Sequence, residues 1–356
     1  MKLSLINLLQ NAGGCATLIF IPILASELGA STFDVGVIVC SYALACFFSS
    51  YVFGRKADII GRKKVLGIGL ISSTIVFPLH IFAYNPFTLT LIRILSGICI
   101  GIYPSALITY AYETSGRVGK VASFGSLGWG IGSFVAGLIG LYFGIFLLST
   151  FFFLIAFIVT LTLPEKEEKK IYVPLFPISV IKKNFDIYIS LFLRHTGASG
   201  LWAVFPLYLL FLGADKFWIG FIYLLNFVCQ FLFMPYVERY SYIHLPKIGF
   251  LLTMIAFLGY MAAPNYIFII PFEILIAIAW SCIYVGCLRC VMNEEEKATG
   301  AGLIHSTTSI SGVIGPLIGG AVAQLFGYKG IIFLGILLAF GGLLLLCGKK
   351  YLRFKP

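Results

Sequence analysis

The chain has 356 residues, of which 60% are hydrophobic and 11% charged, and its formal net charge is +11 at pH 7. Soluble domains average about 45 to 50% apolar and about 25% charged residues, so this composition excludes a soluble enzyme or binding domain. Uncharged stretches of about 20 residues recur along the whole chain, and each is long enough to cross a bilayer as a helix. The sequence therefore predicts an all-α membrane protein surrounded by the lipid bilayer.

Apolar runs separated by charged residues, Gly or Pro predict twelve transmembrane helices. The longest polar segment divides them into six and six. This predicts an N-terminal six-helix bundle at 1–163, a cytoplasmic linker at 164–186 and a C-terminal six-helix bundle at 187–356. The expected spans are 3–28, 34–54, 63–83, 87–112, 119–142, 145–163, 187–212, 217–236, 246–263, 266–290, 299–326 and 328–348.

Positive charge is distributed unevenly between the predicted loops. With a cytoplasmic N-terminus, all but four of the 25 Lys and Arg residues lie on the cytoplasmic side; Lys216 and Lys329 lie outside, and Arg93 and Arg194 lie within spans. An excess of basic residues marks cytoplasmic loops. We therefore expect a multi-pass protein of the cell membrane with both termini in the cytoplasm. The basic charge then sets topology, and no nucleic-acid partner is expected.

The sequence shows no motif for a metal, a cofactor or catalysis. Nine cysteines lie in or at the ends of apolar runs, and the CxxC of Cys287 and Cys290 lacks the second pair of ligands of a zinc site. No nucleotide-binding glycine loop, HExxH or GxSxG motif occurs. We therefore expect no metal, no cofactor, no enzymatic activity and no direct use of ATP.

Small and turn-forming residues of the first half recur in the second half, which unrelated helices would not do. We therefore expect two pseudo-symmetric bundles related by an axis along the membrane normal, with a cavity between them. The matches include Gly13 with Gly197, Pro22 with Pro206 and Gly29 with Gly213 at an offset of 184, and Gly132 with Gly315, Gly137 with Gly320 and Gly144 with Gly327 at an offset of 183.

The charged turn between the second and third spans has a distinctive pattern. Gly54, Asp58, Gly61 and Arg62, followed by two lysines, read GxxxDxxGRKK. This pattern resembles the signature loop of the major facilitator superfamily, a family of transporters. The resemblance implies that Asp58 interacts with a helix N-terminus of the other half and latches the cytoplasmic side shut; alternatively the turn only enforces topology. Ile59 stands where the family usually has Arg or Lys, so a salt bridge assigned to that position cannot form.

Glycines in three spans extend the resemblance. Arg93 and Gly97 in span four are similar to the family's RxxxG element. Span eleven resembles the family's GxxGPxxGG antiporter element, which normally belongs in span five, where this chain has Ser133 in place of the Pro. Small residues at these spacings allow close helix packing, and Pro allows a bend. The expected packing and hinge positions are Gly97, Gly132, Gly137, Gly315, Pro316, Gly319 and Gly320.

Charged side chains inside the spans are candidates for a functional site, because a charge at mid-membrane costs roughly 2.5 to 3.5 kcal/mol and must face protein or water. Arg93 in span four and Glu273 in its counterpart, span ten, lie at matching depths on opposite sides of the expected cavity. We expect Arg93 to bind an anionic or polar group and Glu273 to accept a proton or a cationic group. The alternative is that each is a hydrogen-bonded anchor within its own half.

Spans one and seven hold a second polar set. Gln10 and Asn11 correspond to Arg194 and His195 at the offset of 184. Positions that are polar in both halves are expected to line the cavity, and His195 carries the side chain that titrates nearest neutral pH. The alternative for His195 is a hydrogen-bonded packing residue. Asn226 in span eight is expected to be a further wall residue.

Together these features predict a secondary active transporter of a small organic solute that works by alternating access, as a monomer. The glycine-rich elements and the apolar cavity walls favour proton-coupled export. One alternative is uptake, by a symporter or facilitator, of a sugar, an organic anion or an amino acid; a more distant alternative is a non-transporting membrane sensor. Span one has no acidic residue in its interior, unlike many multidrug antiporters of the family.

Overall fold

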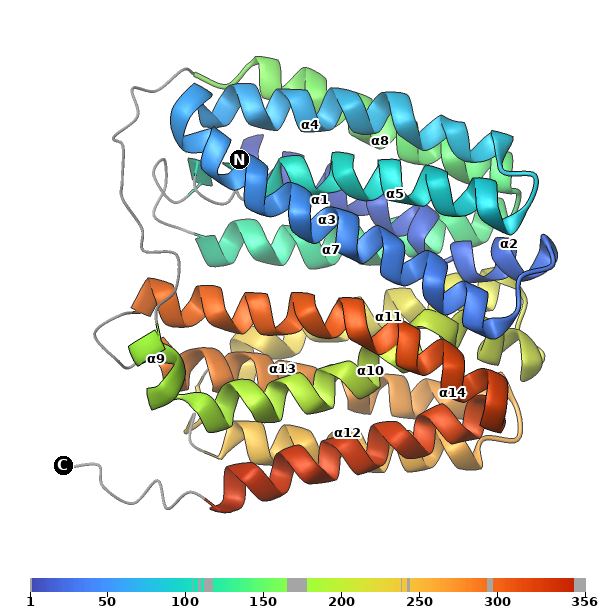
Figure 1. Cartoon of the computed structure of the whole chain (residues 1–356), viewed down its shortest axis with the longest axis vertical. Coiled ribbons are helices and arrows are strands. Elements are labelled where there is room, and N and C mark those ends of the chain that lie inside the picture. Colours follow the sequence, from blue (N-terminus) through green and yellow to red (C-terminus); the bar gives the residue numbers. More distant parts are fainter. Residues whose placement is uncertain are drawn as a thin grey trace. The chain divides into compact units, whose positions relative to one another are not determined.

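A computed structural model describes residues 2–104, 106–107, 110–111, 118–164, 178–237, 239–241, 244–292 and 297–348, and every regular element in these ranges is a helix (Figure 1). The elements are α1 Lys2–Leu18, α2 Ile21–Glu27, α3 Thr32–Ile60, α4 Arg62–Val76, the 3-10 helix η1 Phe77–Phe82, α5 Pro86–Ile102, α7 Val118–Ile139, α8 Tyr142–Leu161, α9 Ile178–Lys183, α10 Phe185–Phe211, α11 Lys216–Val237, α12 Leu245–Ala262, the 3-10 helix η2 Tyr266–Ile269, α13 Ile270–Met292 and α14 Lys297–Gly348.

The helices account for the twelve expected passes. Eight helical segments of the described residues are long and apolar enough to cross a membrane, and Pro86–Ile102 and Ser123–Ile139 are shorter apolar helices. One of the eight, Leu303–Gly348, divides into two passes at Gly327, which has a φ of +69°. The remaining pass is α10, a helix of 27 residues. The all-α fold class is thus confirmed.

The described residues form two compact units. The first lies within Met1–Val173 and Ala214–Val228, and the second within Pro174–Gly213 and Cys229–Pro356. The first unit therefore also includes the beginning of α11. Most of the expected linker lies outside the described residues, so the predicted boundaries at 163 and 187 stay predictions.

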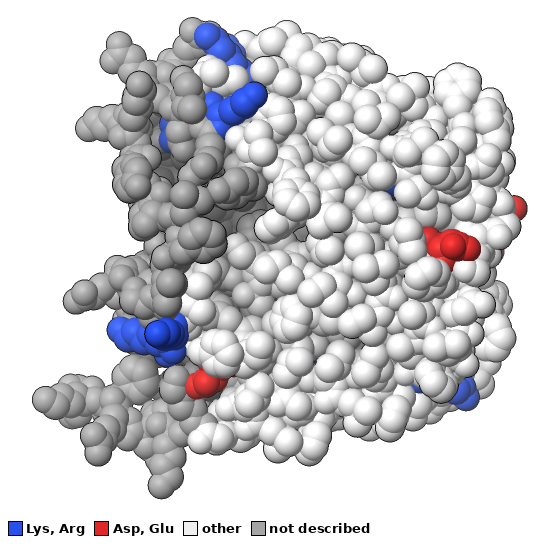
Figure 2. Space-filling view, in the orientation of Figure 1, with Lys and Arg blue, Asp and Glu red and all other residues white. Residues whose placement is uncertain are grey.

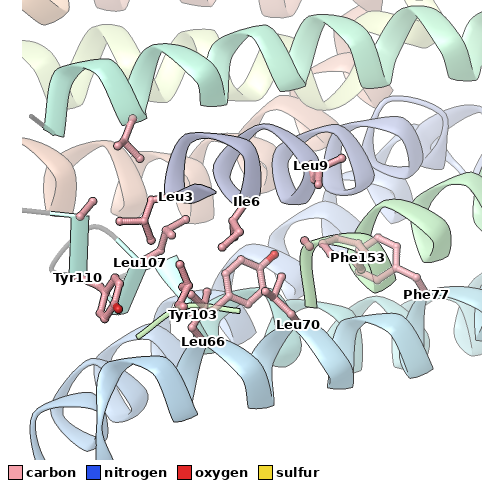
Figure 3. Close-up of a cluster of buried hydrophobic side chains, with 14 residues drawn as sticks. Leu3, Ile6, Leu9, Leu66, Leu70, Phe77, Tyr103, Leu107, Tyr110 and Phe153 are labelled. Atoms are coloured by element: carbon pink, nitrogen blue, oxygen red, sulfur yellow. The ribbon is translucent and has the colours of Figure 1, made fainter. Parts of the chain in front are cut away.

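The core of the first unit lies between α1, α4, α5 and α8. Ile6 of α1, Leu70 of α4 and Phe153 of α8 are fully buried in one cluster (Figure 3). Tyr103 and Leu107, which follow α5, belong to the same cluster. Lipid tails are as apolar as these side chains, so close van der Waals packing, and not removal from water, stabilises this core.

The core of the second unit is centred on α10, which packs along α14, while α12 packs along α13. Leu191 of α10, Phe250 of α12 and Ile283 of α13 are fully buried together. The lipid-facing sides are correspondingly apolar: Phe211 and Leu325 are 72% and 74% exposed. On the face shown in Figure 2, charged side chains gather near the helix ends and the surface between them carries little charge.

One close helix contact repeats in the two units at the offsets found in the sequence. A Cβ on Gly132 of α7 would collide with the carbonyl oxygen of Ala12 in α1, and one on Gly315 of α14 would lie 2.6 Å from the carbonyl oxygen of Thr196 in α10. Ala12 and Thr196 are 184 residues apart, and Gly132 and Gly315 are 183 apart. The same backbone approach therefore occurs once in each half, which confirms the pseudo-symmetry.

One turn away on the same helices, different residues make the equivalent contact in the two halves. Gly128 of α7 meets the carbonyl oxygen of Leu8, and a Cβ there would collide with it. The equivalent position of α14 is Ser311, whose hydroxyl donates a hydrogen bond of 3.2 Å to the carbonyl oxygen of Phe192. A glycine in one half and a small donor in the other thus keep the helices close.

Turn glycines show where the repeat changes register. Gly29 and Gly213, 184 residues apart, have φ angles of +89° and +88°. The next pair with matching φ is Gly140 at +65° and Gly327 at +69°, which are 187 residues apart. The correspondence of Gly144 with Gly327 is therefore wrong at this turn. Four extra residues, about one helical turn, lengthen the first pass of α14 relative to α7.

The charged turn is shorter than the sequence suggested. Helix α3 continues through Gly54 to Ile60, and only Gly61, with a φ of +104°, separates it from α4. The prediction that the turn begins at Gly54 is wrong because Lys, Arg and Ala favour helix and only Gly61 needs the left-handed region. Arg62 is 2% exposed. The side chain of Asp58 lies outside the described residues, so its role as a latch stays a prediction.

Candidate functional site

Amide side chains of α1 bind α7 in the first unit. Asn7 Nδ2 donates to the carbonyl oxygen of Val121 at 2.6 Å, and Gln10 Nε2 donates to Asn7 Oδ1 at 2.7 Å. Asn11 Nδ2 donates to the carbonyl oxygen of Asn7 at 2.7 Å, and its Oδ1 accepts from Trp129 Nε1 at 2.7 Å. The amides therefore hold one another and fix the orientation of the Trp129 indole.

Trp129 is part of an aromatic wall in the same unit. Its ring centroid lies 5.4 Å from that of Phe227 in α11, and both side chains are half-buried. Gly130 lets the two helices come together, since a Cβ there would lie 3.1 Å from Leu224 Cδ1. Asn226, the predicted wall residue, is 5% exposed beside this wall.

Arg93 is a buried cation in α5. The side chain is 1% exposed, and its Cζ lies 3.8 Å from the ring centroid of Tyr42 in α3. In the described part of the chain, its Nε and Nη2 are buried without a hydrogen-bond partner. Gly97 permits this contact by letting α5 approach the backbone carbonyl of Tyr42. Arg93 therefore packs on span two and keeps donors that an acceptor could use.

Arg194 is the buried cation of the second unit. The side chain is 2% exposed, and its Nε and Nη2 donate to Thr253 Oγ1 at 3.2 and 3.1 Å. Thr253 itself donates to the carbonyl oxygen of Gly249 at 2.8 Å. The Cζ of Arg194 also lies 5.3 Å from the ring centroid of Trp280 in α13. The guanidinium thus joins α10 to α12 through one neutral hydroxyl.

Three rings form a row next to Arg194. The ring centroids of His195 and Trp280 are 4.9 Å apart with an interplanar angle of 26°, and those of Trp280 and Tyr284 are 5.5 Å apart at 31°. All three side chains are half-buried. Among the described residues, Nδ1 of His195 is buried without a hydrogen-bond partner. We call His195, Trp280 and Tyr284 the aromatic row.

Glu273 lies in the first turn of α13, about two turns from Trp280. It is 1% exposed and accepts a 2.6 Å hydrogen bond from the hydroxyl of Tyr260 in α12. The carbonyl oxygen of Tyr260 in turn accepts one of 2.6 Å from the hydroxyl of Tyr208 in α10. The carboxylate is therefore tied to three helices of the second unit.

The Arg194 and Glu273 groups occupy two layers. Thr253 and Tyr260 are seven residues apart on α12, as are Glu273 and Trp280 on α13. A spacing of seven places side chains on the same helix face, about 10 Å apart along the axis. One wall of the second unit thus presents a cationic, aromatic layer and, about two turns away, an acidic layer.

The family model described as Major Facilitator Superfamily matches residues 3–294. The chain belongs to the major facilitator superfamily. It is therefore a multi-pass membrane transport protein, as the charged turn and the RxxxG element suggested.

Relatives within the superfamily include drug efflux pumps. The chain is 25% identical to the Quinolone resistance protein NorA of Staphylococcus aureus, over 94% of this chain and 92% of that protein. It is 28% identical to the Multi-drug resistance efflux pump PmrA of Streptococcus pneumoniae, over 44% of this chain and 42% of that protein.

Solved structures of superfamily members share the fold. The nucleoside transporter NupG matches with a TM-score of 0.79 at 15% identity, over 98% of this chain and 97% of that chain. The human organic anion transporter MFSD10 matches with a TM-score of 0.73 at 16% identity, over 97% of this chain and 98% of that chain. At these identities the likeness concerns the fold and not the solute.

The structure brings some predicted residues of this transporter together and leaves others apart. Gln10 and Asn11 lie in one amide network, and Arg194 and His195 share contacts with Trp280. Arg93 belongs to the first unit and Glu273 to the second, so their placement across a cavity stays a prediction.

Sequence reasoning missed the partners of the charged groups, namely Tyr42, Thr253 and Tyr260, and the aromatic Trp129. These residues lie in helices that are apolar on all sides, so no periodic stripe shows which face points inward. The seven-residue spacing of Thr253 from Tyr260, equal to that of Glu273 from Trp280, is the one signal that could have identified the shared wall.

Proposed function

We propose that this superfamily member exports small organic solutes across the cell membrane in exchange for protons, by alternating access of its two halves. It works as a monomer. Both termini lie in the cytoplasm, a topology that rests on the distribution of Lys and Arg. The similarity to NorA over 94% of the chain, and to PmrA over 44% of it, supports export.

The buried carboxylate of Glu273 is the observation that carries proton coupling. A charged group surrounded by apolar side chains is costly, whereas a carboxylic acid can be neutralised by taking one proton. The hydroxyl of Tyr260 holds the carboxylate in place at 2.6 Å. Glu273 therefore takes a proton in one state of the transporter and releases it in the other.

The other buried polar residues act on the solute. Arg93 and Arg194 attract anionic or polar groups, and His195 offers Nδ1, which has no partner among the described residues. Gln10, Asn11 and Asn226 provide amide donors and acceptors, since each amide both donates and accepts hydrogen bonds.

The glycines and the charged turn provide the movement. Gly132, Gly137, Gly315 and Gly319 keep helices close enough to slide as rigid bodies. Gly320 is buried next to Gly319, and Pro316 lies inside α14, where a proline allows a bend. Asp58 of the charged turn holds the cytoplasmic side closed by interacting with a helix N-terminus of the other half. Gly54, Gly61 and Arg62 belong to the same latch.

The test uses the full-length protein in liposomes. Uptake of labelled lipophilic cations, sugars and organic anions is measured with and without an imposed pH gradient, for the wild type, Glu273→Gln and Glu27→Gln. We expect the gradient to drive one solute class in the wild type and in Glu27→Gln, whose carboxylate is at the outer surface, and not in Glu273→Gln. Gradient-driven transport that persists in Glu273→Gln eliminates it as the proton carrier, and no response to the gradient with any solute eliminates proton coupling.

A further inference from the structure

The charge of Arg194 lacks a counter-ion. Both of its hydrogen bonds go to the neutral hydroxyl of Thr253, and in the part of the chain that the structure describes no carboxylate pairs with it. A buried cation without an anion is unfavourable, whereas the planar guanidinium matches a carboxylate with two parallel hydrogen bonds. The site therefore favours an anionic partner.

The aromatic row lies beside this cation. Trp280 contacts both the guanidinium of Arg194, at 5.3 Å, and the imidazole of His195, at 4.9 Å. His195, Trp280 and Tyr284 are each only half-buried, so the aromatic row is not fully enclosed by the protein. Aromatic rings prefer offset-stacked or edge-to-face neighbours 4.5 to 7 Å away, so a planar solute can extend the row.

Two further features of the chain restrict where the anion sits. The acidic layer of Glu273 lies about 10 Å away along α13, and a like charge there would repel an anion. Arg93, the buried cation of α5, has its face covered by Tyr42 at 3.8 Å. The stacked rings of the first unit, His80 and Phe146, are only 1% and 3% exposed and offer little ring surface to a solute. Arg194 is therefore the position where one solute can place an anionic group on a guanidinium and a planar ring against other rings.

We propose that the second unit binds a planar aromatic anion, with a carboxylate or similar acidic group on Arg194 and its ring against the aromatic row. This names the solute class for the site in the proposed function and rests on that function. Nδ1 of His195 supplies a further hydrogen bond to a polar edge of the ring system.

The test compares two ligands with the same ring and different charge. Binding of 2-naphthoate and of 2-naphthamide to the purified full-length protein is measured at neutral pH without any gradient. We expect the wild type to prefer naphthoate. Arg194→Gln removes that preference by lowering naphthoate affinity about 10- to 100-fold, because a hydrogen-bonded charge pair is lost, while naphthamide affinity stays within about two-fold.

Further variants separate recognition from folding. Arg194→Lys keeps the positive charge but loses the two parallel N–H donors of the guanidinium, so a reduced preference for naphthoate should remain. Trp280→Leu lowers the affinity for both ligands by a similar factor, whereas Trp280→Phe keeps a ring and retains most of both. Lys216→Gln, which removes a cation at the end of α11 in the first unit, changes neither affinity.

The proposal is overturned if the wild type binds naphthoate and naphthamide with equal affinity. It is also overturned if Arg194→Gln and Arg194→Lys each lower the affinity for the two ligands by the same factor. Gradient measurements keep it distinct from the proposed function. If naphthoate binds with these preferences but no solute responds to a pH gradient, proton-coupled export fails and the aromatic-anion site stands. If lipophilic cations are exported and naphthoate does not bind, the export function stands and the site assignment fails.

Discussion

The hydroxyl of Tyr260 donates a 2.6 Å hydrogen bond to Oε1 of Glu273, and so links α12 to α13 through a buried carboxylate. The same tyrosine accepts a hydrogen bond from Tyr208 through its backbone carbonyl. The carboxyl group of Glu273, which can change its charge, is thus linked to three helices. Protonation there would alter the strength of this hydrogen bond and the packing around it.

Replacing Tyr260 by Phe should slow transport without uncoupling it. The variant keeps the carboxylate of Glu273 and loses one hydrogen bond, which costs about 0.5 to 1.5 kcal/mol of stability, or up to about 3 kcal/mol when the acceptor is charged. Uptake into liposomes should therefore still follow the pH gradient at a lower rate. Uptake by Tyr260→Phe that ignores the gradient, as expected for Glu273→Gln, would show that the hydroxyl itself carries the proton.

Gly319 of α14 should not tolerate a side chain. Its neighbour is the backbone of Gly200 in α10, and a Cβ would collide with it. Gly319→Val should lower stability by about 1 to 3 kcal/mol through overpacking, seen as a lower melting temperature in detergent. Gly312→Ala is the control, because no heavy atom of the described residues lies within 4 Å of a Cβ there. Equal melting temperatures for the two variants would contradict the close α10–α14 approach.

The Glu27–Lys216 ion pair should contribute little through charge alone. The Nζ of Lys216 lies 3.7 Å from Oε1 of Glu27, and both side chains are partly exposed, at 26% and 51%. Glu27→Gln should change stability by less than about 1 kcal/mol, and less still at high salt. Lys216→Gln should cost about 0.5 to 1 kcal/mol more, because Nζ also lies 3.8 Å from the Tyr142 ring centroid. Thermal unfolding at low and high salt compares the two losses of stability. A larger loss in Glu27→Gln than in Lys216→Gln would contradict the prediction.

Asp58→Asn should insert normally and transport poorly. Removing the carboxylate deletes an interaction with a helix N-terminus worth up to about 2 kcal/mol, so the cytoplasmic side no longer stays latched. Asp34→Asn is the matched control: Asp34 caps α3 by accepting a 3.0 Å hydrogen bond from the backbone of Ser31, so it should lose about 1 kcal/mol of stability and keep transport. Expression levels of both variants report insertion, and initial rates report transport. A normal transport rate in Asp58→Asn would rule out the latch.

The passes and the repeat could be predicted from the sequence because hydrophobic length and glycine spacing are local signals. Gly132 and Gly315 were matched by sequence alone, and their equivalent backbone contacts confirm the match. The extension of α3 to Ile60 was missed because charge suggests the end of a span, whereas a helix can continue into water.

The partners of the buried charges were missed for a different reason. Which residue of α12 meets Arg194 depends on how the helix is rotated, and an apolar helix carries no stripe that specifies rotation. Thr253 looked like any small residue in an apolar run. The structure supplies that rotation, and with it the two layers on one wall.

The connections at one end of each unit are very short. They consist of residues 28–31, 83–85, 140–141, 212–215, 263–265 and the single residue Gly327. If this is the outer side, as the distribution of Lys and Arg indicates, antibodies and proteases find almost no loop to recognise. At four of these connections an inserted epitope would disturb helix ends that depend on a positive-φ glycine, namely Gly29, Gly140, Gly213 and Gly327. Single cysteine substitutions labelled with small reagents therefore suit topology mapping from that side better.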